Sequence, residues 1–107
     1  MLSERRSSAR IQAKYPARLR GPDTERKPFK EDTVLQNLSN GGAYLYSKRE
    51  VPEGAGVFLA VRLSLAPHVG LGSPALMLAA RGRVTRVEPK PDGRRGLAIE
   101  FERRRVL

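Results

Sequence analysis

The chain has 107 residues, of which 39% are hydrophobic and 6% aromatic, and its 21 Lys and Arg outnumber 11 Asp and Glu to give a formal net charge of +10. This length allows one domain with a single core. The absence of cysteine excludes disulfides and thiolate metal sites, and apolar runs such as Val57 to Val61 are far shorter than the ~18 residues of a membrane span.

The basic excess, most of it arginine, attracts partners that carry phosphate, whether nucleic acid, nucleotide or anionic lipid. Arginine suits bidentate recognition of phosphates and guanine edges. A genome rich in G and C would produce the same excess, so charge alone does not choose a partner. The amino end carries no hydrophobic signal region after its charges, and we therefore expect a cytoplasmic protein with no membrane span.

The first eleven residues are polar and basic and predict a flexible N-terminal arm. Six strands are then predicted from alternating apolar and polar positions and from turn residues between them. Turns are predicted at 39–42, where Asn-Gly-Gly tolerates positive φ, and around Asp92 and Gly93. The expected strands are residues 13–21, 29–38, 43–47, 57–65, 75–88 and 97–101.

Alternation also predicts which side chains share a face. Leu35 and Asn37 are expected on one side of the second strand, and Val84 and Arg86 on one side of the fifth, which we expect to be bent. The tail after Phe101 is expected to start a short helix or to fray. Almost no helical periodicity occurs, so the fold class is all-β, a small antiparallel barrel or sandwich. A barrel is favoured because closure removes exposed strand edges.

The sequence shows no pattern of residues that is typical of a catalytic site. His68 is the only histidine and lies in a Pro/Gly loop, and Ser39 has no candidate base near it in the sequence. The carboxylates are scattered. We therefore expect a protein that is not an enzyme and holds no metal or cofactor.

Two short motifs carry binding chemistry when they are taken together. Arg6 and Arg10 are spaced RxxxR on the arm, and Asn37, Ser39 and Gly42 form the pattern NxSxxG at a predicted strand end. An amide and a hydroxyl can bond the edge of a base, and a glycine lets the backbone approach a flat ligand. Two guanidinium groups can hold phosphates and the guanine N7 and O6 acceptors. The set matches a guanine nucleotide with more than one phosphate.

These motifs, in this order, resemble those of the PilZ domain family of receptors for cyclic di-GMP. "ERRSSARI" is similar to the opening of that family, "NLSNGGAYL" to its signature hairpin, and "ARGRVTRVE" and "GLAIEF" to its later strands. The resemblance implies a six-stranded antiparallel split β-barrel, formed by residues 12–107 behind an arm of residues 1–11, within one domain of residues 1–107.

The same resemblance implies the roles of the site residues. Arg6 and Arg10 would bind phosphates and guanine edges, with Arg5 as an auxiliary contact, while Asn37 and Ser39 would meet a guanine and Gly42 would keep the turn open. Cyclic di-GMP would then be the ligand. The arm would close over it and alter a surface offered to a downstream protein partner.

Two alternatives stay open from the sequence. The first is a nucleic-acid-binding small barrel, supported by the charge and by arginines 81, 83, 86, 94, 95 and 103–105. Single-strand binders use exposed aromatic rings as stacking platforms, whereas Phe58 and Phe101 are expected in the core, so we expect no nucleic-acid partner. The second is a PilZ-like interaction module that binds no ligand, which the presence of both motifs disfavours.

Overall fold

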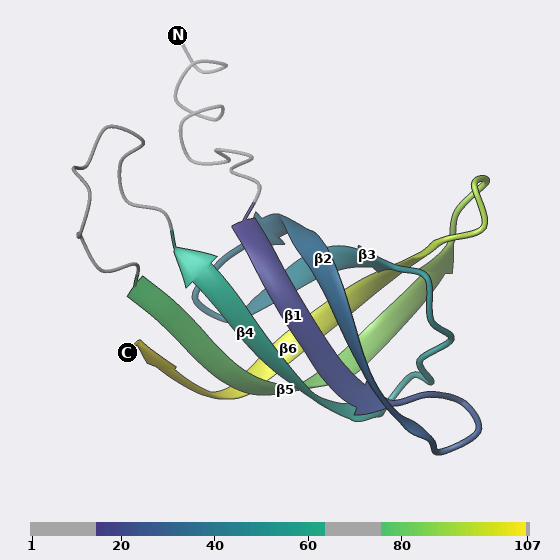
Figure 1. Ribbon diagram of the computed structural model, residues 1–107, viewed down its shortest axis with the longest axis horizontal. Helices are drawn as coiled ribbons and strands as arrows, with labels where there is room; N and C mark the ends of the chain where they lie inside the picture. The colour runs from purple at the N-terminus through teal and green to yellow at the C-terminus, as the bar shows by residue number, and fades with distance from the viewer. Residues whose placement is uncertain (1–14, 64–75, 107) are drawn as a thin grey trace, which may run out of the picture.

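The computed structural model describes residues 15–63 and 76–106, which form a closed barrel of six antiparallel strands (Figure 1). Neighbouring strands follow the order β1-β2-β3-β6-β5-β4, with β4 returning to β1. The prediction of an all-β, six-stranded antiparallel barrel is confirmed. The strands are β1 (Tyr15–Pro22), β2 (Pro28–Leu38), β3 (Gly42–Ser47), β4 (Gly56–Leu63), β5 (Leu76–Pro89) and β6 (Arg95–Val106).

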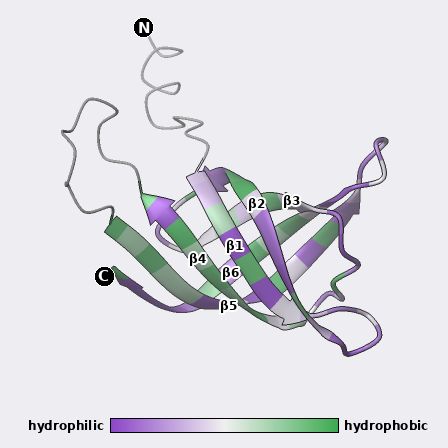
Figure 2. Ribbon diagram, in the orientation of Figure 1, coloured by the Kyte–Doolittle hydropathy of each residue, from purple (hydrophilic) through white to green (hydrophobic). Residues whose placement is uncertain are grey.

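Alternate residues of each strand point into the barrel, which gives the banded hydropathy of the ribbon in Figure 2. Leu19 of β1, Leu45 of β3 and Leu59 of β4 are each buried between exposed or half-buried neighbours. The core is aliphatic, with Phe29 as its one buried aromatic side chain among the described residues. Its fully buried members include Leu19, Leu35, Leu45, Leu97, Val51, Val57, Val61 and Val84.

Two bulges overturn the predicted faces of β2 and β5. The β2–β3 register shifts between Leu35 and Asn37, so Asn37 pairs with Tyr44 and is exposed while Leu38 packs against the core. In β5 the register shifts twice, and beyond the second shift Arg86 is exposed while Val87 packs against the core. A bulge adds one residue to one strand and thereby reverses the alternation that follows it.

Two further expectations are wrong. Phe58 lies on the outside of β4 with a relative exposure of 47%, whereas Phe101 is half-buried and packs against the core as expected. The tail neither frays nor turns helical, because β6 continues to Val106 and residues 103–106 pair with β5. Arg103, Arg104 and Arg105 pair with β5 residues that lie far away in the sequence, so local propensity could not predict this pairing.

Both predicted hairpin turns occur, at 39–41 and around Gly93, whose φ of 88° is left-handed. The expected arm, Ala13 and His68 fall outside the described residues. In the described part of the chain, no helix is long and apolar enough to cross a membrane.

Candidate functional site

The NxSxxG motif forms the hairpin between β2 and β3. The backbone NH of Ser39 donates to the carbonyl oxygen of Gly42 at 2.9 Å and closes the turn. The Ser39 hydroxyl also approaches that oxygen, but at 3.4 Å the hydrogen bond is long and weak. Ser39 is exposed, so its hydroxyl can exchange this contact for one to a ligand at little cost.

Asn37 owes its position to the β2 bulge. Because the bulge turns it outward, its side chain stands on the outer surface of the barrel beside Tyr44. Within residues 15–63 and 76–106, its amide takes part in no hydrogen bond. The amide therefore offers both a donor and an acceptor to a ligand on the surface.

Gly42 brings the hairpin against β6. It pairs with Glu100, and a Cβ at this position would overlap the backbone carbonyl oxygen of Ile99. Left-handed φ angles occur, among the described residues, at Arg26, Gly54 and Gly93, so the motif turn does not use the positive φ that its Asn-Gly-Gly composition predicts. Close backbone approach, rather than turn conformation, requires glycine at this position.

Arg104 is a contact of the motif that the sequence did not reveal. From β6 its Nη1 donates to the backbone oxygen of Asn40 and lies 3.5 Å from the Asn40 side-chain oxygen. The backbone NH of Phe101 donates to the carbonyl oxygen of Gly41 at 2.8 Å. The end of β6 therefore holds the tip of the hairpin in place. Because a helical or frayed tail was expected there, this contact could not be predicted from the sequence.

The outer face beside Asn37 continues across three more strands. Asn37 pairs with Tyr44 on β3, Tyr44 with Ala98 on β6, and Ala98 with Arg86 on β5. Ala98 is the small member of this row. In the pairing register it lies between the phenol of Tyr44 and the guanidinium group of Arg86.

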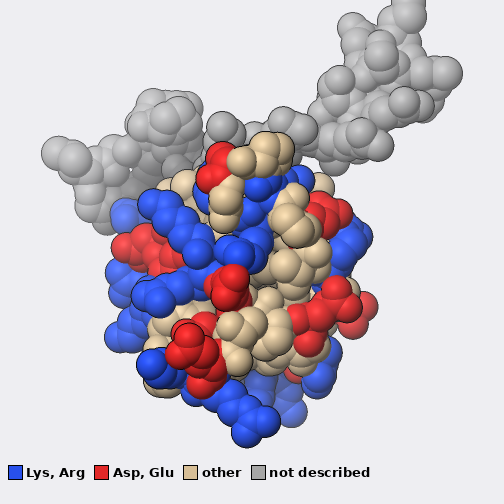
Figure 3. All heavy atoms as spheres, turned by 90° about the vertical axis from the view of Figure 1, so that its right-hand side faces the viewer, with Lys and Arg blue, Asp and Glu red and all other residues tan. Residues whose placement is uncertain are grey.

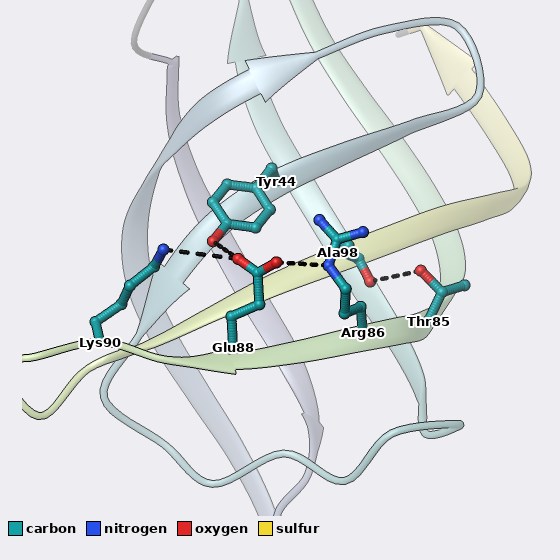
Figure 4. A network of polar contacts seen from close by, with 6 residues as sticks. All are labelled: Tyr44, Thr85, Arg86, Glu88, Lys90 and Ala98. Atoms are coloured by element: carbon teal, nitrogen blue, oxygen red, sulfur yellow. Dashed lines mark hydrogen bonds and ion pairs between the residues drawn. The ribbon is translucent and has the colours of Figure 1, made fainter.

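Glu88 holds this row in place through three partners (Figure 4). It accepts from the Tyr44 hydroxyl at 2.6 Å and from Arg86 Nε at 2.7 Å, and the Lys90 ammonium lies 3.6 Å away. The hydrogen bond from Tyr44, followed by the one from Arg86, lowers the pKa of Glu88. Burial and the Glu88 contact raise the pKa of Tyr44. Glu88 therefore stays ionised and Tyr44 neutral at physiological pH.

Three of the six site residues predicted from the sequence, Asn37, Ser39 and Gly42, are brought together on one hairpin. Arg5, Arg6 and Arg10 lie outside the described residues. The chain nevertheless enters the barrel beside the hairpin, because Tyr15, the first residue of β1, pairs with Leu35 near the end of β2. The segment that contains the three arginines is thus attached close to the motif.

The surface of the described residues is strongly basic, with acidic groups interspersed on the face shown in Figure 3. No cluster of three or more His, Asp or Glu side chains that could hold a metal ion occurs among these residues. At the hairpin, Asn37 and Ser39 offer neutral hydrogen-bonding groups, with Arg104 close by and the exposed Glu100 opposite Gly42. The neutral groups suit the polar edge of an organic ligand.

The model of the PilZ domain family matches residues 4–106, which is nearly the whole chain and includes both motifs. Comparisons with curated proteins and with solved structures give no match. PilZ domains are binding modules, either for cyclic di-GMP or as adaptors. With its six-stranded barrel and its NxSxxG hairpin, the chain belongs to the PilZ domain family.

Proposed function

We propose that this protein is a cytoplasmic receptor for cyclic di-GMP that binds the messenger between its N-terminal arm and the β2–β3 hairpin. Arg6 and Arg10 hold phosphates and the guanine N7 and O6 acceptors, and Arg5 adds an auxiliary contact. Asn37 and Ser39 bond a guanine edge. Gly42 lets the hairpin pack closely against β6 and so holds Asn37 and Ser39 in position.

The observation that carries the proposal is the exposed Asn37 and Ser39 pair at the corner where β1 begins. Arg10 precedes Tyr15 by five residues, which span at most about 17 Å when extended. The neighbouring strand is only about 4.8 Å away. The length of the chain therefore allows Arg10, and Arg6 beyond it, to reach a ligand seated on the hairpin.

The row that follows Asn37 supplies a surface for the rest of the ligand. Ala98 is small and lies between Tyr44 and Arg86 in this row. The Arg86 guanidinium group can stack on the face of a purine or bond a phosphate. Because Glu88 already fixes Tyr44 and Arg86, binding here orders few additional side chains.

The ligand acts by changing a surface, since the site has no catalytic groups. The arm closes over the bound messenger, and the altered arm and barrel face are read by a downstream protein partner. This is the behaviour of an adaptor whose output is set by its partner.

Hydrogen exchange of the full chain with and without cyclic di-GMP tests this arrangement. The backbone amides of residues 3–10 and of residues 37–42 should both exchange more slowly with the ligand present, while amides around Gly93, at the other end of β6, should not change. Protection of neither segment would contradict the proposal. Protection of the hairpin alone would contradict closure of the arm.

A salt titration separates this function from nucleic-acid binding. Affinity for a nucleic acid falls steeply as salt rises, because binding releases many counterions. A small ligand with few phosphates, held also by hydrogen bonds to its bases, should lose much less affinity. If the affinity for cyclic di-GMP fell with salt as steeply as that for an oligonucleotide, the result would count against a site that holds the ligand by hydrogen bonds to its bases.

A further inference from the structure

A row of five exposed side chains crosses the outside of the barrel away from the hairpin site. Phe58 on β4 stands directly opposite Arg20 on one side and Arg81 on the other. Arg20 in turn faces Lys30 on β2, and Arg81 faces Arg103 on β6. The row therefore places one aromatic ring at the centre of four cations contributed by four different strands.

This arrangement is unfavourable in the absence of a partner. Like charges directly opposite each other on antiparallel strands repel, and the row contains two such pairs, Arg20 with Lys30 and Arg81 with Arg103. In the described part of the chain, none of these four cations is in an ion pair. Among the described residues, the Phe58 ring offsets part of the repulsion, with the Arg20 and Arg81 guanidinium carbons 5.7 and 5.4 Å from its centroid.

The row borders a hollow on the surface of the barrel. The adjacent row places Ala60 and Ala79 between Arg18 and Arg105, and these small side chains form the floor of a groove of about 690 Å³. A second hollow of about 660 Å³ shares Arg20, Lys30 and Phe58 with it. Phe58 thus lines both depressions, and because they share three lining residues we regard them as one groove.

No carboxylate is among the described residues that line either hollow, in contrast to the mixed charges on the face of Figure 3. Asp32 pairs with Arg18, which lines the first hollow, at 2.9 Å. Charge complementarity requires an anionic occupant. A concave surface that runs through two adjoining hollows fits a segment of chain better than a flat membrane surface, which would contact protruding residues.

We propose that this groove, which we call the Phe58 groove, binds an acidic segment of a protein partner. Guanidinium groups take carboxylates bidentately, and the exposed Phe58 ring gives an apolar contact within the acidic segment. A single-stranded nucleic acid would need several stacking platforms, and the one ring here already contacts two arginines. The inference does not depend on cyclic di-GMP, because the groove is formed without the hairpin residues Asn37, Ser39 and Gly42.

The test uses the full chain and a fluorescein-labelled, glutamate-rich peptide, with fluorescence anisotropy as the readout. The peptide should bind, and the same peptide with every Glu replaced by Gln should not. In the double variant Arg81→Gln/Arg103→Gln, affinity should fall by at least about tenfold, since hydrogen bonds between charged groups are among the stronger ones. Arg20→Gln/Lys30→Gln, on the other side of Phe58, should behave alike.

The matched control is Lys48→Gln/Arg94→Gln, which removes the same charge outside both hollows and should bind like the original chain. Thermal unfolding checks that each variant is folded. Equal affinity in all variants would overturn the proposal, because binding would then follow net charge. Tighter, groove-dependent binding of an oligothymidylate or of phosphatidylglycerol vesicles than of the peptide would also overturn it, in favour of a nucleic acid or a membrane.

Discussion

At the residue scale, glycine at position 42 is required by the backbone of the neighbouring strand. A Cβ there would overlap the Ile99 carbonyl oxygen, whereas a Cβ at Gly41 would have nothing within 4 Å. The two adjacent glycines of the motif therefore have different roles. The motif pattern, which fixes the second and not the first, coincides with this packing difference.

We predict that Gly42→Ala destabilises the protein by about 1–3 kcal/mol, the usual cost of overpacking, because the hairpin must move away from β6. Gly41→Ala is the matched control and should change the free energy of unfolding little. Denaturant unfolding of the three proteins measures both effects. Equal stability of the two variants would show that the hairpin does not depend on this close approach.

The Tyr44–Glu88 hydrogen bond makes part of the stability dependent on pH. The pKa of Glu88 in the folded protein is below its ordinary value of 4.5, so its contribution is present above pH 4.5 and is lost as the pH falls through the folded-state pKa. Tyr44 is the first cause of the lowered pKa. A variant without the Tyr44 hydroxyl should therefore lose less stability than the original protein when the pH is lowered.

We predict that Tyr44→Phe has a lower melting temperature than the original protein at neutral pH. The gap between the two melting temperatures should become smaller as the pH falls below 4.5. Tyr46→Phe is the control, because the Tyr46 hydroxyl makes no hydrogen bond within the described residues. Thermal unfolding between neutral and acid pH provides the measurement. A constant difference at every pH would refute the assignment of this linkage to Tyr44.

The outward position of Asn37 could not be predicted from the sequence. Simple alternation places Asn37 with Leu35, and the bulge between them reverses its face. Closing six strands into a barrel bends them, and bulges take up that bending. Such a bulge depends on the register between β2 and β3, and this register cannot be predicted from the residues of β2 alone. The motif was recognisable from the sequence, but its presentation was not.

At the element scale, five strands were predicted close to their observed bounds and β6 was predicted too short. Turn residues and alternating apolar positions mark each of the first five strands locally. The end of β6 carries three consecutive arginines, whose strand conformation comes from pairing with β5. These residues connect the hairpin with the Phe58 groove, since Arg104 contacts Asn40 of the hairpin while Arg103 and Arg105 border the groove.

We predict that Arg103→Gln raises stability by about 0.2–1 kcal/mol, because it removes a like-charge pair with Arg81. Arg83→Gln removes the same charge but breaks an ion pair with Glu102, so it should leave stability unchanged or lower it slightly. Thermal unfolding at low salt compares the two. A loss of stability in Arg103→Gln larger than in Arg83→Gln would contradict the repulsion inferred for the row.

At the scale of the whole molecule, the antiparallel pairing of β1 with β2 places the start of β1 beside the end of β2, at the corner of the barrel that holds the hairpin. Two motifs about thirty residues apart in sequence are thereby attached at one corner. Their chemical complementarity could be inferred from residue types alone. The exposed Phe58 and its flanking cations could not, because the row is assembled from five strands and each contributes a single residue to it.

Titration calorimetry of the full chain with cyclic di-GMP tests the divided site most directly. We predict saturable binding, weakened at least about a hundredfold in Arg6→Ala/Arg10→Ala and clearly weakened in Asn37→Ala/Ser39→Ala, because each change removes charged or polar hydrogen bonds to the ligand. Arg26→Ala/Arg94→Ala, at the opposite ends of β2 and β6 from the hairpin, should bind like the original chain. No binding by the original chain, or unchanged affinity in the arginine double variant, would contradict the account.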